Sequence, residues 1–457
     1  MCSRRRLLAG GAAGLSGVAL SQLLAGEALG RGKTHFPAAA KRVIWLFMHG
    51  GPSHVDLFDP KPELAKWAGK PLPDSVGTVE TRRAVAKNPL LAAVKPLRPR
   101  GRSGIEVSDF LPNMAALADE MCVIRSCHGD SVNHPQSVYQ MNTGSVLMGR
   151  PSFGSWVSYG LGSENDDMPA FVVLPDPGGG LKGGPLAWGS GYLPATYQGT
   201  TLRPGPNPIL HLKPDEETRP GRGRAVLDLT RRLNEMHQER RGFDTHLDAR
   251  VRAYELAYRM QSAAPEAVDL GDESAATRRL YGLDDPVTRE FGTRCLLARR
   301  MVERGVRFVQ LYSGDTNGWD AHNDVLKNHA EYAAKTDLPV AGLLRDLKQR
   351  GLLEDTLVIW GGEFGRMPMS EKGTGRDHNP WGYTTVLFGA GVKKGHVHGA
   401  TDDFGLRAEV DKVHVHDLHA TLLHLLGLDH ERLTYRHHGR DDRLTDVAGQ
   451  VVRGILS

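Results

Sequence analysis

The sequence predicts an α/β fold, with a mostly parallel central sheet, helices on both faces and a helical insertion. Apolar runs of five or six residues alternate with segments of helical periodicity, a pattern typical of strands buried on both faces of a parallel sheet. The 457 residues are 40% hydrophobic and 24% charged, with 54 glycines and 27 prolines. This composition supports one large core with many loops and excludes collagen, a coiled coil and extensive disorder. The net charge of only +4 gives no reason to expect a nucleic-acid partner.

Residues 1–30 have the pattern of a twin-arginine signal peptide. Ser3-Arg4-Arg5-Arg6-Leu7-Leu8 precedes an apolar run rich in glycine and alanine, and Glu27 is the first acidic residue. A retained membrane anchor or an ordinary helix could share this run, but its many small residues would make a weak anchor. Cleavage after Gly30, or as late as Ala40, would follow passage through the twin-arginine export machinery. We therefore expect a periplasmic or otherwise exported protein with no stable membrane span.

The first half of the remaining chain predicts strands and helices in alternation. The apolar run at 43–48 predicts a strand that ends abruptly at His49-Gly50-Gly51-Pro52. The proline- and lysine-rich residues 56–105 predict loop with short helices. Periodicity then predicts a helix at 111–120, a strand at 121–126, a helix at 134–141 that ends near Thr143-Gly144, and a strand at 170–174.

An irregular and then helical stretch at about 176–305 interrupts this alternation. Residues 176–222 are rich in glycine and proline, and their segment from Gly178 to Gly184 is expected to be a flexible loop. Residues 222–262 and 285–305 carry helical periodicity with dense charge. The pattern therefore predicts a loop and helical insertion within a single domain at 41–457.

The alternation resumes after the insertion. Strands are expected at 307–312, 356–360 and 384–388, and helices at 324–350 and 416–426. The last helix carries His416, His419 and His424 mostly opposite its leucines, which favours a polar helix face over a metal-binding tract.

Histidines and carboxylates follow the carboxyl ends of four predicted strands, where ligands collect in an open α/β sheet. Neutral imidazoles with carboxylates suit borderline divalent metals such as zinc, manganese or iron. Structural alternatives remain for each residue: Asp320 could cap a helix, Glu363 could pair with Arg366, and His49 could be a core histidine. Their shared position nevertheless predicts a site for a divalent, zinc-like ion. The candidate ligands are His49, Asp56, His128, Asp320, His322, Glu363 and His378.

Several long motifs, in order, resemble the exported bacterial proteins of domain-of-unknown-function family 1501. They include LFMHGGPSHVDLFDPKP, SCHGDSVNHPQSVYQMNTG, RFVQLYSGDTNGWDAH, VIWGGEFGRMP and GRDHNPWGY. That family is similar to the sulfatase branch of the alkaline phosphatase-like superfamily. The resemblance implies a sulfatase-like α/β fold with a metal site at the carboxyl edge of the sheet. It also implies a nucleophile at a helix N-terminus.

The resemblance maps onto this sequence with departures. Asp320, His322 and His378 resemble ligands of the superfamily, whereas Glu363 stands where an aspartate is usual and His49 where the first strand delivers one. His134 occupies the nucleophile position, nine residues before Thr143, where sulfatases carry a cysteine. Ser131 could supply a hydroxyl only if the local alignment slips.

The resemblance therefore implies an exported metal-dependent hydrolase of sulfate or phosphate esters that acts through metal-activated water. An anionic ester, for example a sulfated or phosphorylated glycan or other polysaccharide, is the expected substrate. His134, or alternatively Ser131, would act in catalysis, and Arg366 or Arg376 would bind an anionic oxygen. The alternative is a catalytically degenerate sulfatase-like protein that acts as a binding or assembly module.

Overall fold

A computed structural model describes residues 34–203, 205, 208–209, 222–241 and 245–457. The predicted export signal at 1–30 lies outside these residues. Among the helices that the model describes, none is long and apolar enough to cross a membrane.

A nine-stranded sheet forms the centre of the molecule, in the order β12-β4-β11-β8-β1-β7-β5-β6, with β15 paired to β4. Only β11 runs antiparallel to its neighbours, β4 and β8. The predicted α/β class with a mostly parallel sheet is therefore confirmed. The strands are β1 Arg42–Met48, β4 Cys122–His128, β5 Phe171–Leu174, β6 Thr200–Thr201, β7 Phe308–Ser313, β8 Thr356–Gly361, β11 Tyr383–Gly389, β12 His396–His398 and β15 Val413–His414.

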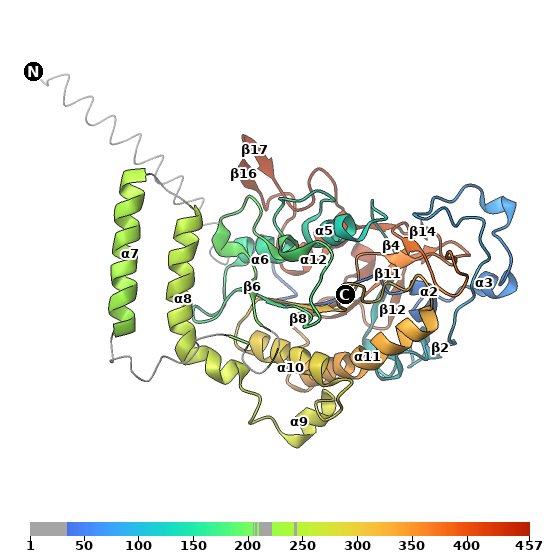
Figure 1. The fold of residues 1–457 in the computed structure, drawn as a ribbon, viewed down its shortest axis with the longest axis horizontal. Helices are drawn as coiled ribbons and strands as arrows, with labels where there is room; N and C mark the ends of the chain where they lie inside the picture. Colours follow the sequence, from blue (N-terminus) through green and yellow to red (C-terminus); the bar gives the residue numbers. More distant parts are fainter. Residues whose placement is uncertain (1–33, 204, 206–207, 210–221, 242–244) are drawn as a thin grey trace, which may run out of the picture.

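Helices cover both faces of this sheet (Figure 1). Side chains alternate along a strand, so Ile44 and Leu46 of β1 pack into one core cluster, and Trp45 and Phe47 into another. The first cluster includes α10 Arg289–Glu303 and α11 Val325–Gln349. The second includes α5 His134–Thr143, α6 Phe153–Leu161 and α12 Val415–Leu425. Because the strands are buried on both faces, their sequences are unbroken apolar runs.

The remaining elements are short, apart from two long helices, α7 Arg222–Arg241 and α8 Thr245–Val268. The short helices are α2 His54–Leu57, α3 Pro62–Lys66, α4 Pro112–Ala115, α9 Ala275–Leu280 and the 3-10 turns Asp74–Val76, Ala118–Glu120, Gly184–Trp188, Ala195–Tyr197 and Arg453–Ile455. The short strands pair as β2 Leu97–Arg100 with β3 Ile105–Ser108, β9 Gly365–Arg366 with β10 His378–Asn379, β13 Ala400–Thr401 with β14 Ala408–Val410, and β16 Tyr435–His437 with β17 Arg440–Asp442.

Three local predictions need correction. The helix expected at 111–120 is two pieces, α4 and a 3-10 turn, because the chain tightens to short-range bonds such as Met121 N–H to the Ala118 carbonyl before it enters β4. The hairpin of β2 and β3 lies in a stretch expected to be loop with short helices. His419 is buried rather than on a polar face, and its Nε2 bonds the Met141 carbonyl at 2.8 Å.

Candidate metal centre

Three strands of the parallel sheet end side by side and bring their following loops together. Met48 of β1 pairs with Ser313 of β7, and Phe47 of β1 pairs with Gly361 of β8. His49 therefore leaves the sheet beside the loop that carries Asp320 and His322, and beside the loop that carries Glu363. Because all three strands run in one direction, their carboxyl ends form a single edge at which these polar side chains collect.

Two further segments close the site. Helix α5 begins at His134, with Asn133 as its N-cap residue and Pro135 in its first turn, a position where proline costs no hydrogen bond. His378 lies in β10, opposite Arg366 of β9. The start of a helix and a small two-stranded ribbon thus add their histidines to the sheet edge.

Three potential ligand atoms lie close enough together to bind one ion; they belong to Asp320, His322 and His378. Nε2 of His322 lies 3.1 Å from Oδ1 of Asp320 and 3.0 Å from Nε2 of His378. Nε2 of His378 lies 3.4 Å from the same Oδ1. Ligands held about 2.0–2.2 Å from one divalent ion stand roughly 3.0–3.5 Å apart. The three distances therefore fit one face of a coordination shell.

The hydrogen bonds of His378 prepare it as a ligand. Its Nδ1 donates to the Val132 carbonyl at 2.6 Å. Because a carbonyl can only accept, Nδ1 carries the proton and Nε2 is left with its lone pair toward Asp320 and His322. Histidine ligands of metals are commonly oriented by such a bond at the other ring nitrogen. The site therefore offers an unprotonated nitrogen where a cation would be held.

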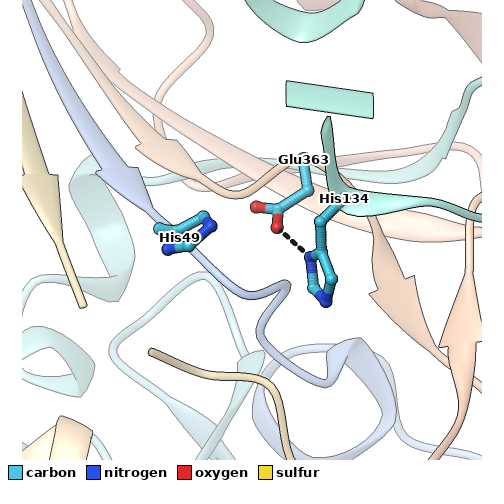
Figure 2. Close-up of side chains that lie close together, drawn as sticks. All are labelled: His49, His134 and Glu363. Atoms are coloured by element: carbon cyan, nitrogen blue, oxygen red, sulfur yellow. Dashed lines mark hydrogen bonds and ion pairs between the residues drawn. The ribbon is translucent and has the colours of Figure 1, made fainter. Parts of the chain in front are cut away.

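His49, His134 and Glu363 form an adjoining group, with one ligand atom from each lying within 4.8 Å of the others. Figure 2 shows the Glu363 carboxylate between the two imidazoles, with a bond from His134 Nδ1 to Oε1 at 2.6 Å. The carboxylate also accepts from the Gly50 N–H at 3.0 and 3.1 Å. His49 is fixed by a 2.9 Å bond from its Nδ1 to the Asp315 carbonyl.

His134 connects the two groups through its two ring nitrogens. Nδ1 faces Glu363, whereas Nε2 lies 3.0 Å from Oδ2 of Asp320 without meeting hydrogen-bond geometry. Nδ1 of His322 is also buried without a hydrogen-bond partner, and Oδ1 of Asp320 meets no hydrogen-bond geometry although Nη2 of Arg366 lies 2.7 Å from it. Buried polar atoms are rarely left unpaired unless an ion, water or ligand satisfies them. These orphaned atoms and the donor set of imidazoles and carboxylates fit a divalent cation.

Two cationic side chains face the same aspartate. Arg366 is fully buried, and its Nη2 lies 2.7 Å from Oδ1 of Asp320 while its Nε donates to the Gly51 carbonyl at 2.9 Å. Lys182 approaches from the opposite carboxylate oxygen, with Nζ 3.0 Å from Oδ2. Arg366 was a candidate from the sequence, but Lys182 was missed.

The glycine-rich segment that carries Lys182, expected from the sequence to be a flexible loop, makes specific contacts beside the site. The Tyr139 hydroxyl donates to the Gly183 carbonyl at 2.7 Å, and the Lys182 N–H donates to Nε2 of His49 at 3.3 Å. Gly179 and Gly180 have φ of 71° and 76°, and a Cβ on Gly180 would lie 2.1 Å from the Thr316 hydroxyl oxygen. Glycine is required here because the segment passes so close to the loop after β7.

Burial and charge hold the site in the protonation state that metal binding needs. Burial opposes ionisation of Asp320, but the charge of Arg366 and the proximity of His134, His322 and His378 keep the pKa of Asp320 well below its usual value. The pKa of Glu363 is also lowered, since bonding to His134 and the nearby His49 outweigh its burial. Burial lowers the pKa of His49 and brings that of His378 to about 2. Ionised carboxylates and neutral imidazoles are the forms that bind cations.

Asp56 and His128 are not brought into either group. Asp56 is fully buried in α2, where its Oδ1 accepts from Nη2 of Arg376 at 3.0 Å and from the Val94 N–H at 2.9 Å. Its Oδ2 accepts from Nε of Arg376 and from the Ser53 hydroxyl, so both oxygens are occupied. His128 ends β4, half-buried, with its ring 5.0 Å from that of His414.

Ser131 lies before the helix rather than at its first turn. Its hydroxyl accepts from the Asn133 N–H at 3.2 Å, and its carbonyl accepts from the Ser137 hydroxyl at 2.6 Å. Asp377, which the candidate ligands did not include, joins His322 and His378 in a third group that could hold a metal. Only its place beside His378 in the sequence GRDHN could have pointed to it.

Comparison with known proteins identifies a family but no activity. The family model described as "Protein of unknown function (DUF1501)" matches residues 40–456. Among curated proteins, none shows significant sequence similarity to this chain.

Solved structures of low similarity include sulfatases and phosphatases. PsFucS1 sulfatase from Pseudoalteromonas sp. is 14% identical, with 90% of this chain and 71% of that chain covered and a TM-score of 0.35. Phosphonate monoester hydrolase SpPMH from Silicibacter pomeroyi is 14% identical, with 76% and 71% covered and a TM-score of 0.34. A TAB5 alkaline phosphatase mutant with Mg bound in its M3 site is 10% identical, with 87% and 100% covered and a TM-score of 0.35. Similarity this low carries no information on substrate or reaction.

Proposed function

We propose that this chain, which belongs to the DUF1501 family, is a metal-dependent hydrolase of sulfate or phosphate esters. The observation that carries the proposal is the convergence of Asp320 Oδ1, His322 Nε2 and His378 Nε2 at 3.0–3.4 Å from one another. Three protein ligands with an open position are typical of catalytic rather than structural zinc sites. A bound divalent cation would supply a Lewis acid for the ester oxygens and would activate water.

His134 is placed to move a proton beside these ligands. Its Nδ1 is held by Glu363, so the ring cannot rotate freely, and its Nε2 faces the metal ligand Asp320. An imidazole fixed by a carboxylate is a suitable general acid or base. Since position 134 carries neither a hydroxyl nor a thiol, we expect water to attack the ester directly, without a covalent enzyme intermediate.

Lys182 and Arg366 give the site its preference for anions. Both carry positive charge against Asp320, and Lys182 is the more accessible, with about a quarter of its side chain exposed (23%). The partly exposed Lys182 can bind the sulfuryl or phosphoryl oxygens of an entering ester. The buried Arg366 can stabilise the negative charge of Asp320 and of the bound ester. A sulfated or phosphorylated glycan is the substrate class we favour.

We further propose that the enzyme acts after export, in the periplasm or beyond it. The support is the sequence of residues 1–30, with its paired Arg4 and Arg5 before an apolar run. Replacing both arginines with lysine should leave the precursor in the cytoplasm. Unchanged export of that variant would show that the twin-arginine machinery is not used.

Hydrolysis of a panel of chromogenic esters tests the proposed activity. The mature protein, purified with zinc or manganese, should release nitrophenol from a sulfate or phosphate ester. His378→Ala should abolish this release, whereas His128→Ala, which removes an imidazole outside the site, should preserve it. A folded, metal-loaded protein that hydrolyses no sulfate or phosphate ester would instead favour the degenerate binding or assembly module.

A further inference from the structure

His49 lies directly after β1, against the loop that follows β7. Its N–H donates to the Ser313 carbonyl at 2.9 Å, and its carbonyl accepts from the Trp319 N–H at 2.9 Å. A Cβ on Gly318 would lie 2.1 Å from the same carbonyl oxygen, so the two segments pass very close to each other. The backbone of His49 is therefore fixed, and its side chain is fully buried.

Both nitrogens of the His49 ring have a partner within the protein. Nδ1 lies 2.9 Å from the Asp315 carbonyl oxygen, which can only accept, so Nδ1 carries the ring proton. Nε2 is then left with a lone pair, and it accepts from the Lys182 N–H at 3.3 Å. Burial lowers the pKa of His49 and favours the neutral ring, whose one donor and one acceptor are both used by these bonds.

His49 differs from His378 in what its unprotonated nitrogen faces. Nε2 of His378 lies 3.4 Å from Oδ1 of Asp320, where an ion would be held. Nε2 of His49 instead faces a backbone N–H. Figure 2 shows the same distinction within the adjoining group, because the drawn bond joins Glu363 to His134 and none joins Glu363 to His49. The lone pair with which His49 would bind an ion is thus already in use.

The bond to His49 helps to hold Lys182 at the metal centre. While the Lys182 N–H bonds the imidazole, the Lys182 Nζ lies 3.0 Å from Oδ2 of Asp320. The next residue, Gly183, is tied to α5 through the 2.7 Å bond from the Tyr139 hydroxyl to its carbonyl. A cation fixed in place before an anion arrives binds that anion with a smaller loss of conformational entropy.

We propose that His49 is a positioning residue and not a metal ligand: it holds the segment 178–184 so that Lys182 meets the anionic group of the substrate. The part of this proposal that concerns the substrate rests on the proposed function. The hold of His49 on the segment does not, since it follows from the bonds of the imidazole alone.

Two other roles for His49 make different predictions. The sequence places it among the candidate ligands, and one of its ring nitrogens lies within 4.8 Å of ligand atoms of His134 and Glu363. An ion bound there would need the Nε2 lone pair and would break the bond to Lys182. A histidine that only fills the core would support the whole fold, with no specific effect at Lys182.

Limited proteolysis with trypsin, which cleaves after lysine and arginine, tests the hold on the segment. His49→Phe keeps a buried ring but loses both bonds, so cleavage after Lys182 should be about five- to tenfold faster than in the wild type. His49→Gln offers a donor and an acceptor and should restore slow cleavage. Cleavage after Arg102, whose side chain is 97% exposed, should be equal in all three proteins.

Steady-state kinetics tests the effect on substrate. Because His49 acts through Lys182, His49→Phe should raise KM about tenfold with little change in kcat or metal content. Adding Lys182→Met to His49→Phe should raise KM no further, since coupled residues are not additive. A protein that hydrolyses no ester would refute the proposed function, whereas the trypsin result would still decide whether His49 holds the segment.

A crystal of the zinc-loaded wild type tests the same assignment without any variant. Anomalous scattering should place no zinc ion within about 2.0–2.1 Å of His49 Nε2, and the Lys182 N–H should still face that nitrogen. A zinc ion at Nε2 would overturn the proposal, and so would loss of metal from a folded His49→Phe protein. Cleavage of His49→Phe after Lys182 at the wild-type rate, or acceleration after Arg102 as well, would also contradict it.

Discussion

Nε2 of His134 lies 3.0 Å from Oδ2 of Asp320, although the other ring nitrogen of His134 already donates to Glu363. A neutral imidazole in this tautomer turns a lone pair toward a carboxylate, which is unfavourable unless a positive charge lies between them. A proton or a metal ion would supply that charge. The pair therefore links the metal ligands to the residue at the start of α5.

His134 should be needed for hydrolysis, whereas Ser131 should not. The variant His134→Ala removes the group that moves a proton, so kcat should fall by about 10²–10⁴-fold. Ser131→Ala should keep most of the activity, because the Ser131 hydroxyl makes only a local bond to the Asn133 N–H. Steady-state kinetics of both metal-loaded variants checks this. Trapping a covalent adduct on Ser131 would contradict the expected direct attack by water.

Lys182 should affect substrate binding more than metal binding. Removing its charge in Lys182→Met should raise KM about tenfold, equivalent to about 1.4 kcal/mol, because an anionic ester loses a cationic contact. Metal affinity should stay equal or rise, since Lys182 no longer competes for Oδ2 of Asp320. Lys182→Arg serves as the charge-matched control. A loss of metal in Lys182→Met would show that the lysine shapes the ligand site instead.

Asp56 should contribute to stability and not to metal binding. Asp56→Ala leaves Arg376 buried without its carboxylate partner, which typically costs about 3–5 kcal/mol. Chemical denaturation should show this loss, and metal content per folded chain should be unchanged. The pKa of Asp56 is lowered because Arg376 outweighs the effect of burial, so this stabilisation should disappear as the pH falls. A folded Asp56→Ala variant that has lost its metal would return Asp56 to the ligand set.

His419 should make stability depend on pH below neutrality. Burial brings its pKa to about 3 from an ordinary value of 6.5, so between these values the unfolded chain binds a proton that the folded chain does not. His419 therefore does not change the free energy of unfolding above pH 6.5. As the pH falls toward 3, it lowers the free energy of unfolding by about 1.4 kcal/mol per pH unit. His419→Gln, which keeps a donor for the Met141 carbonyl, should flatten this slope. An unchanged slope would show that His419 has the same pKa in the folded and unfolded chains.

The sequence predicted most of the central sheet because its strands are buried on both faces. Of the residues expected to meet at one ion, Asp320, His322 and His378 lie together, whereas Glu363 lies in the adjoining group with His49 and His134. Asp56 was wrongly included because its partner, Arg376, lies 320 residues away in the chain, and no local pattern shows such a pair.

Helix α6 and the role of Lys182 could not be predicted from the sequence, for different physical reasons. Helix α6 was not predicted, and its glycines Gly154 and Gly160 lower its helix propensity. The structure shows why glycine stands there: a Cβ on Gly154 would lie 2.6 Å from Phe171, and one on Gly160 would lie 3.0 Å from Leu433. Lys182 was missed because the glycines around it suggested flexibility, whereas contacts with the loop after β7 fix the segment.

Metal analysis of the purified mature protein decides whether Asp320, His322 and His378 hold a cation. Elemental analysis by mass spectrometry should find about one transition metal per folded chain, with anomalous scattering from a crystal placing it between Asp320, His322 and His378. The variants Asp320→Asn and His378→Ala should lose this metal, and His128→Ala should retain it. A folded wild-type protein that binds no divalent ion, even after incubation with zinc or manganese, would contradict the account.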